Sequence, residues 1–307
     1  MSFDVLQEKI IALKNPTVAG LDPKPEYVPE HIRRESYGRY GETLEGAADA
    51  VLQFNKGLID ALCDIVPAVK PQSAYYERLG WHGMIALEQT IRYAHGKGMY
   101  VIADIKRGDI GSTAEAYADA WLGAAKVGET LCQGFNADCV TLNGYMGSDT
   151  VEPFVEACKR YGKCLFLLAK TSNPGSGELQ NLTAGEKKVY QLLGDMAEKL
   201  GADTQGKYGY GLAGAVTGAT YPEELSELRA RLPHTFFLVP GYGAQGGTAQ
   251  DVQHAFDNHG RGAIVNASRS IMCAWQKTGR DGLDYQEAAR AAAEEMRDAI
   301  GAYVTIR

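Results

Sequence analysis

The sequence predicts an α/β protein with the (β/α)8 fold, a TIM barrel in which residues 1–307 form a single domain with a further helix at each end. Two observations lead to this prediction. Short apolar runs alternate with longer segments of helical periodicity, which is typical of parallel strands joined by crossover helices. Eight such runs occur, the number that a closed barrel requires, and they are apolar almost throughout, as expected for strands buried on both faces.

The eight expected strands cover residues 17–21, 66–70, 100–104, 139–142, 164–169, 212–216, 235–239 and 263–266. In a parallel barrel all strands end at the same rim, so polar residues that follow several strands converge there. Six strands end in such residues, namely Asp22, Lys70, Asp104 with Lys106, Asn143, Lys170 with Thr171 and Ser172, and Ser268 with Arg269. This rim is therefore the expected location of a functional site.

Helical periodicity predicts helices over residues 44–61, 82–95, 113–122, 150–161, 184–200, 222–232, 248–258 and 285–302. The first fifteen residues mix apolar and charged side chains, which indicates a short amphipathic helix rather than the core of a signal peptide. The segment 172–210 begins with a long connection rich in glycine, asparagine and serine. We expect a lid over the barrel mouth there, with a plain surface insertion as the alternative.

Composition argues against several classes of protein. Hydrophobic residues make up 45% of the chain and charged residues 22%, and no apolar run approaches the ~18 residues of a membrane span. The formal net charge of −7 argues against a broad surface for nucleic acid, so neither nucleic acid nor a membrane is an expected partner. The six cysteines form no C-x-x-C pair, which favours reduced thiols and a cytoplasmic location.

Charged residues are concentrated after the third expected strand, in the stretch ADIKRGDIGST. Asp104 and Lys106 are two residues apart, so both side chains point to one face if the strand continues through them. The polar residues expected close to this pair are Asp22, Lys70, Asp109 and Thr113. For any one of them the alternative is a salt-bridge cluster that only closes the barrel. Because buried charge is costly, its repetition at one rim favours a catalytic array in which carboxylates hold lysines ionised.

A phosphate site is predicted after the last two strands. The stretch VPGYGAQGGT (239–248) is rich in glycine and precedes a helical pattern, and Arg269 follows the eighth strand. In barrels the loops at these two positions often bind phosphate through backbone N–H groups. Glycines allow the backbone to approach the phosphate, and an arginine supplies bidentate charge.

Other kinds of site find little support in the sequence. No strand is followed by a G-x-G-x-x-G that opens a helix, and no P-loop motif occurs. The six histidines show no paired ligand spacing. A metal ion held by carboxylates such as Asp104 and Asp109 is the one metal arrangement left open.

The chain resembles the orotidine 5′-phosphate decarboxylases, in particular their longer bacterial subgroup. The resemblance rests on a D-x-K-x-x-D element at Asp104, Lys106 and Asp109, followed by Ile110 and Thr113. It extends to the strand-ending Asp22 and Lys70 and to TSNPG (171–175), VTGAT (216–220), PGYGAQGG (240–247) and Arg269. These motifs occur in the family's order at the expected strand ends. Ser268 departs from the pattern because many members have glycine there.

The resemblance implies a homodimeric barrel that converts orotidine 5′-phosphate to UMP and CO2, the last step of UMP synthesis, without a metal or an organic cofactor. Lys106 would protonate C6 of the pyrimidine, and Asp104 would lie beside the departing carboxylate. The other implied roles are ribose contacts and completion of the charge array for Asp22 and Lys70, contacts across the dimer interface for Asp109 and Thr113, a base contact for Ser172, and phosphate contacts for Gln245 and Arg269. Arg107 is given no part in the chemistry.

Two alternatives stay open. A related barrel of the hexulose-phosphate synthase type shares D-x-K-x-x-D but uses Mg²⁺ to stabilise an enediolate. Lys70, the TSNPG element and Gln245 favour the decarboxylase. The second alternative is an inactive barrel that binds a nucleotide or serves as a scaffold, and the intact charge array argues against it.

Overall fold

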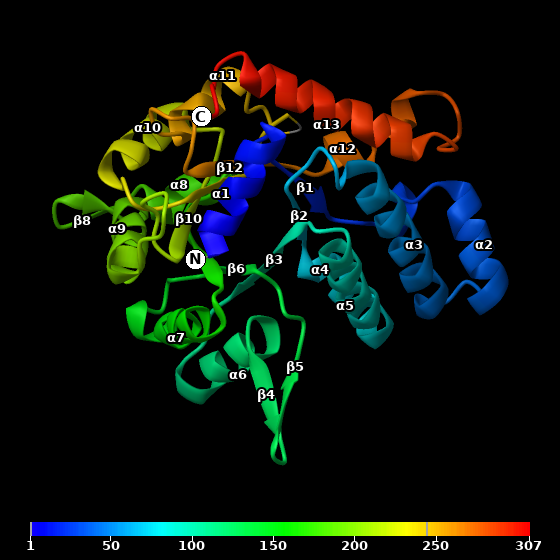
Figure 1. Ribbon diagram of the computed structural model, residues 1–307, viewed down its shortest axis with the longest axis horizontal. Coiled ribbons are helices and arrows are strands. Elements are labelled where there is room, and N and C mark those ends of the chain that lie inside the picture. Colours follow the sequence, from blue (N-terminus) through cyan, green and yellow to red (C-terminus); the bar gives the residue numbers. More distant parts are fainter. Residues whose placement is uncertain (1, 244) are drawn as a thin grey trace.

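Eight parallel strands form a closed barrel in a computed structural model that describes residues 2–243 and 245–307. The strands, in the order in which they neighbour one another, are β1 (Thr17–Leu21), β2 (Ala68–Pro71), β3 (Tyr100–Arg107), β6 (Cys139–Leu142), β7 (Cys164–Lys170), β10 (Ala213–Thr217), β11 (Phe237–Val239) and β12 (Ala263–Ala267). Pairing of β1 with β12 closes the ring (Figure 1). All eight expected strands are present, and the predicted barrel is confirmed.

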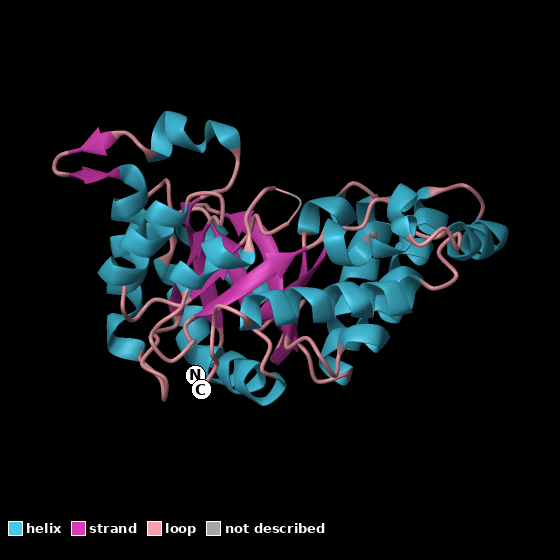
Figure 2. Cartoon of the chain, turned by 90° about the horizontal axis from the view of Figure 1, so that it is seen from above, coloured by secondary structure: helices cyan, strands magenta, loops and turns pink. Residues whose placement is uncertain are grey.

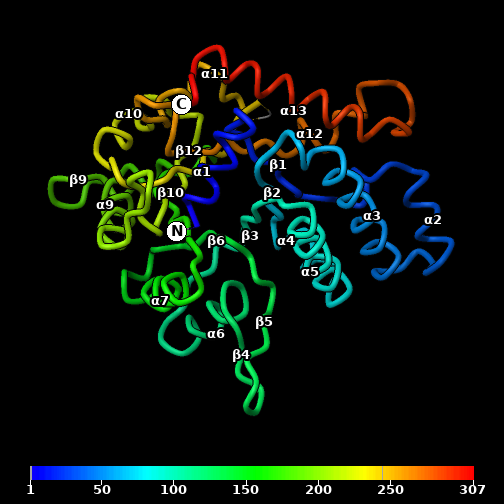
Figure 3. The backbone as a smooth tube through the Cα atoms, viewed as in Figure 1, coloured from blue at the N-terminus to red at the C-terminus, as the bar shows by residue number. Residues whose placement is uncertain are grey.

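Long helices surround the barrel and connect its strands (Figures 1 and 3). They are α3 (Leu44–Leu62), α5 (Gly80–Gly96), α6 (Gly111–Trp121), α7 (Glu152–Tyr161), α9 (Val189–Gly201), α10 (Pro222–Arg231) and α13 (Tyr285–Gly301). Shorter helices follow several strands, namely α4 (Ser73–Glu77), α11 (Ala249–Val252) and α12 (Arg269–Met272). The sequence sets the start of α3 locally. The Thr43 hydroxyl accepts the N–H of Gly46 at 3.1 Å and caps the helix.

The N-terminal helix α1 (Ser2–Leu13) covers the end of the barrel at which the strands begin. Phe3 stacks on Phe236 with ring centroids 4.8 Å apart and contacts Phe166 at 5.0 Å. Ser2 hydrogen-bonds the hydroxyl of Tyr100, the first residue of β3, at 2.7 Å. The amphipathic helix predicted at the N-terminus therefore closes this end of the barrel, and the opposite rim is left for a site.

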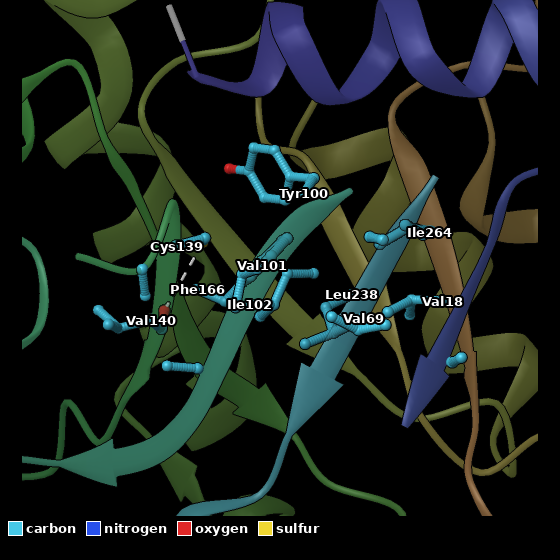
Figure 4. Close-up of a cluster of buried hydrophobic side chains, with 14 of the residues drawn as sticks. Val18, Val69, Tyr100, Val101, Ile102, Cys139, Val140, Phe166, Leu238 and Ile264 are labelled. Carbon is cyan, nitrogen blue, oxygen red and sulfur yellow. Dashed lines mark hydrogen bonds between the residues drawn. The ribbon is translucent and has the colours of Figure 1, made fainter. Parts of the chain in front are cut away.

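Apolar side chains on the barrel strands are buried and form a cluster (Figure 4). Val69, Ile102 and Leu238 come from β2, β3 and β11, and each is at most 3% exposed. Full burial of such a side chain contributes about 1.5–3 kcal/mol. This packing makes the strands a rigid support for the residues at their carboxyl ends.

Some predicted boundaries were wrong. The helix expected over 184–200 begins at Val189, and the one expected over 248–258 is reduced to α11 and a 3-10 turn, Gln253–Ala255. The longest of the elements that were missed are the helix α2 (Glu30–Tyr40) and the hairpin of β4 (Ala124–Val127) and β5 (Thr130–Gln133). Both are largely polar or exposed, so they lack the apolar periodicity on which the prediction relied.

The segment 172–210 consists of two parts with different structures. Its first part forms α8 (Gly177–Gln180) and a hairpin of β8 (Thr183–Ala184) and β9 (Lys187–Lys188), which projects at the end of the barrel opposite the chain termini (Figure 2). Its second part is α9, an ordinary barrel helix with Tyr190 and Ala197 buried. Residues 189–201 of the predicted lid therefore belong to a barrel helix, and a lid formed by residues 172–188 stays a prediction.

All six cysteines are free, and three of them, Cys139, Cys158 and Cys164, are buried. Burial raises the pKa of the Cys164 thiol to about 12. No helix in the described part of the chain combines the length and apolar character needed to cross a membrane.

Candidate active site

A cavity of about 550 Å³ opens at the carboxyl ends of the strands. Each barrel strand contributes a lining residue, either within the strand or directly after it. Seven of the nine predicted site residues line this cavity, namely Asp22, Lys70, Asp104, Lys106, Ser172, Gln245 and Arg269. The convergence that the strand ends predicted is therefore present within one chain.

The Asp104 carboxylate is the centre of a charged network. Its Oδ2 accepts from Lys70 Nζ at 2.8 Å, and its Oδ1 accepts from Lys106 Nζ at 2.5 Å. The hydroxyl of Thr141, in β6, donates to the same Oδ1 at 2.7 Å. Asp104 comes from β3 and Lys70 from β2, so two neighbouring strands fix the relative positions of these charges.

Burial and ion pairing act in opposite directions on this network. Burial alone would raise the pKa of Asp104, but Lys70 and Lys106 outweigh it and hold that pKa well below its ordinary range. Burial alone would likewise lower the pKa of Lys70, but Asp104 and Asp22 outweigh it and the pKa is raised. The carboxylate of Asp104 and the ammonium of Lys70 are therefore both charged at neutral pH.

Two buried oxygen atoms at the cavity have no hydrogen-bond partner among the described residues. They are Asp22 Oδ1, which lies 3.9 Å from Lys70 Nζ, and Asn266 Oδ1. Asp22 follows β1 and Asn266 lies in the adjacent β12. Because native proteins satisfy nearly all buried acceptors, these two atoms can receive hydrogen bonds from a ligand with hydroxyl groups.

The backbone at Lys106 departs from the regular strand in which side chains alternate between the two faces. Lys106 has a φ of +48°, in the left-handed region that residues other than glycine rarely adopt. The pairing of β3 with β6 shifts register between Ala103 and Arg107. Asp104 and Lys106 do meet as the two-residue spacing predicted, but an irregular turn rather than a regular strand brings them together.

The predicted phosphate loop is a tight turn after β11. Gly241 and Gly246 both have a φ of +100°, and the N–H of Gly247 donates to the carbonyl of Gly241 at 3.0 Å. Residues other than glycine are strained in this conformation, because they carry a Cβ. Gln245 and Arg269 line the adjacent wall of the cavity. Ala244, within the PGYGAQGG motif, lies outside the described residues.

A glycine in β1 leaves room for the residue that departs from the family pattern. A Cβ added to Gly20 would lie 2.0 Å from Ser268 Oγ and 2.9 Å from Asn266 Oδ1. We expect Gly20→Ala to lower the free energy of unfolding by about 1–3 kcal/mol through overpacking. Urea denaturation measures this loss. The double variant Gly20→Ala/Ser268→Gly should recover most of it, and equal loss in both variants would contradict the steric explanation.

Asp109 and Thr113 are the two predicted residues that the chain does not bring to its own cavity. Asp109 Oδ1 accepts the N–H of Ile110, and Thr113 is exposed in the first turn of α6. The side chain of Ile110 between them is also exposed, at 63%. Asp104 lines the cavity of one chain and Asp109 does not, so this cavity does not hold both carboxylates that the sequence left open for a metal ion.

Among the lining residues that the sequence analysis did not predict, two polar ones come from barrel strands. Thr141 lies inside β6, where attention to strand ends does not find it, and Asn266 is the last residue of the expected strand 263–266 but was not selected there. The signal was a single polar residue within each apolar run, CVTL and AIVNA. In the described part of the chain, no group of three or more His, Cys, Asp or Glu side chains is arranged to hold a metal ion.

Comparison with known proteins shows similarity over nearly the whole chain. A family model described as orotidine 5′-phosphate decarboxylase / HUMPS family matches residues 45–278. An orotidine 5′-phosphate decarboxylase of Rhodopirellula baltica is 43% identical, covering 96% of this chain and 97% of the relative, and one of Clostridium perfringens (strain SM101) is 41% identical, covering 98% of each. The solved structure of Leishmania donovani OMP decarboxylase has a TM-score of 0.74 and 31% identity, covering 98% of each chain.

Proposed function

The chain belongs to the orotidine 5′-phosphate decarboxylase / HUMPS family, and we propose that it is a carboxy-lyase that converts orotidine 5′-phosphate to UMP and CO2 in pyrimidine biosynthesis. The observation that carries the proposal is the Asp104 carboxylate held between two ammonium groups at the mouth of the barrel. Relatives that share nearly the full length of this chain have that activity in their names. A cytoplasmic location stays a prediction.

The proposed chemistry uses Lys106 as electrostatic stabiliser and proton donor. The bond between C6 and the carboxylate breaks, CO2 leaves, and the electron pair remains on C6, where the ring offers no conjugated sink. An ammonium held in advance near C6 stabilises this charge. Lys106 then transfers a proton from Nζ to C6, which gives UMP, and the neutral amine regains a proton from solvent. No step requires a metal ion.

The remaining roles follow the chemistry of the cavity. Asp104 would lie beside the departing carboxylate, in line with its charged state and its position between the lysines. Asp22, with an unpartnered buried oxygen, and Lys70 would contact ribose hydroxyls. The residues proposed for the other substrate groups are Ser172 for the base and Gln245 with Arg269 for the phosphate. Closure of the segment 172–188 over the bound phosphate would exclude water from the site.

The direct test follows the ultraviolet absorbance of orotidine 5′-phosphate with purified protein, with and without EDTA. We expect conversion to UMP at equal rates in both samples. Turnover that needs added Mg²⁺ and a sugar phosphate instead would assign the chain to the hexulose-phosphate synthase branch of the family. Absence of both reactions, with UMP still bound, would support an inactive nucleotide-binding barrel.

Asp109 and Thr113 are proposed to act in the partner's site of a homodimer. We expect that mixing Lys106→Ala and Asp109→Ala subunits restores activity, because a mixed dimer contains one site with both residues intact. After complete random exchange, decarboxylation should reach about a quarter of the wild-type rate. The matched control mixes Lys106→Ala with Asp104→Asn subunits, two residues proposed for the same chain's site, and should restore nothing. Equal rates in both mixtures would contradict a shared site.

A further inference from the structure

The backbone at Lys106 is held in a conformation that the strand alone would not give. Its φ is +48°. Ala103 pairs with Val140 and the next pair is Arg107 with Leu142, so four steps along β3 lie opposite two steps along β6. Irregularities of this kind re-aim a side chain and persist only where the surroundings hold them.

Arg107, the next residue, binds back across this turn. Its Nη1 donates to the carbonyl of Ile105 at 3.1 Å, on the other side of Lys106. Its Nη2 is paired with the Glu77 carboxylate in α4, and its Cζ lies 5.6 Å from the centre of the Tyr117 ring in α6. Arg107 is not among the residues that line the cavity.

We propose that Arg107 is a positioning residue that holds the left-handed turn at Lys106 and so directs its ammonium toward Asp104 and the reacting carbon. This inference rests on the proposed function. The Lys106 side chain is 45% exposed, so packing does not fix its path and the backbone must do so. A guanidinium can bind a carbonyl and a carboxylate at once through separate N–H groups, which a single ammonium does less well.

Thr141 holds the same turn from the other side. Its Oγ1 accepts the N–H groups of Ile105 and Lys106, each at 3.0 Å, while its hydroxyl donates to Asp104. The turn is therefore held at two N–H groups by Thr141 and at one carbonyl by Arg107. Removal of Arg107 frees the carbonyl and leaves the N–H contacts, so the turn loosens while the strand stays in place.

A purely structural salt bridge is the competing explanation. The side chains of Arg107 and Glu77 are 29% and 37% exposed, and ion pairs with such access to water contribute little to stability. A structural role therefore predicts that removal of Arg107 has small effects on kcat, KM, UMP affinity and the thermal midpoint alike. A positioning role predicts a selective effect on kcat, because a displacement of about 1 Å at a reacting group can cost about 10²-fold in rate.

The test compares Arg107→Ala, Arg107→Lys and the control Arg92→Ala, which removes the guanidinium of a surface pair with Glu88 in α5. For Arg107→Ala we expect kcat for orotidine 5′-phosphate to fall by about 10²-fold. KM, the affinity for UMP and the thermal midpoint should stay close to those of the control. Arg107→Lys should recover part of kcat, because it keeps the charge beside Glu77 but cannot bind both partners.

Three results would overturn the proposal. They are a kcat of Arg107→Ala equal to that of the control, a fall of UMP affinity and thermal midpoint in step with kcat, or full activity of Arg107→Lys. Crystal structures of the wild type and Arg107→Ala give a readout that does not depend on activity. The proposal expects φ of Lys106 to leave the left-handed region in the variant, and an unchanged turn would refute it. Failure of the wild type to decarboxylate would instead refute the proposed function.

Discussion

Replacement of Lys106 by alanine is expected to lower kcat for orotidine 5′-phosphate by at least about 10³-fold while a UMP-like inhibitor still binds. Lys106 Nζ lies 2.5 Å from Asp104 Oδ1 at the wall of the cavity. In the proposed mechanism, the substitution removes both the positive charge that faces the developing carbanion and the proton that C6 receives. Absorbance measurements of turnover and calorimetric titration with UMP separate the loss of chemistry from a loss of binding.

The fold should tolerate this substitution. The Lys106 side chain is half-exposed, and Asp104 retains Lys70 and Thr141 as hydrogen-bond partners. A matched control is Lys159→Ala, which removes an exposed lysine from a surface pair with Glu156. We expect wild-type turnover from the control. Turnover by Lys106→Ala at the same rate would contradict the role of Lys106 as proton donor.

The barrel could be predicted because strands buried on both faces are visible as short apolar runs. All eight were found, and four had both bounds correct or missed only the last residue: 17–21, 139–142, 164–169 and 263–266. Elements with little buried surface gave no such pattern. In α2 only Ile32 and Ser36 are buried, and both strands of the hairpin β4–β5 are almost fully exposed.

The site was predictable where a residue's chain position determines its place in space. Asp22, Lys70 and Asp104 come at the ends of parallel strands, so their convergence followed from the fold. The left-handed turn at Lys106 did not follow. Thr141 in β6 accepts the Lys106 N–H, and Glu77 in α4 pairs with Arg107, so these contacts form only when β3, β6 and α4 are assembled. Sequence spacing alone does not contain these tertiary contacts.

Asp104→Asn is expected to abolish turnover and also to destabilise the fold. The amide keeps the shape of the carboxylate but removes its charge. The ammonium of Lys70, a residue only 4% exposed, then has Asp22 as its remaining carboxylate, with Oδ1 at 3.9 Å. Breaking a buried ion pair on one side costs about 3–5 kcal/mol. The matched control is Asp64→Asn, whose carboxylate pairs with Arg290 at the surface and should contribute about 1 kcal/mol or less. Urea denaturation at pH 7 measures both.

The loss of stability in Asp104→Asn should depend on pH in a defined direction. The folded-state pKa of Asp104 is depressed, so its contribution is present above the ordinary pKa of an aspartate, about 3.9, and is lost as the pH falls through the depressed value. The difference between wild type and variant should stay constant down to about pH 5 and shrink below about pH 4. A difference that grows on acidification would contradict a charged Asp104 in the folded state.

A double substitution separates the two roles of this network. Lys70→Met/Asp104→Leu replaces both buried charges by apolar side chains, and such replacements are often neutral or stabilising by about 1–4 kcal/mol. We expect the double variant to be more stable than Asp104→Asn and still inactive, as measured by urea denaturation and by absorbance of orotidine 5′-phosphate. That outcome would mean that the fold does not need these charges and that catalysis does. Recovery of turnover without them would contradict the proposed charge array, and a double variant no more stable than Asp104→Asn would show that the ion pair itself supports the barrel.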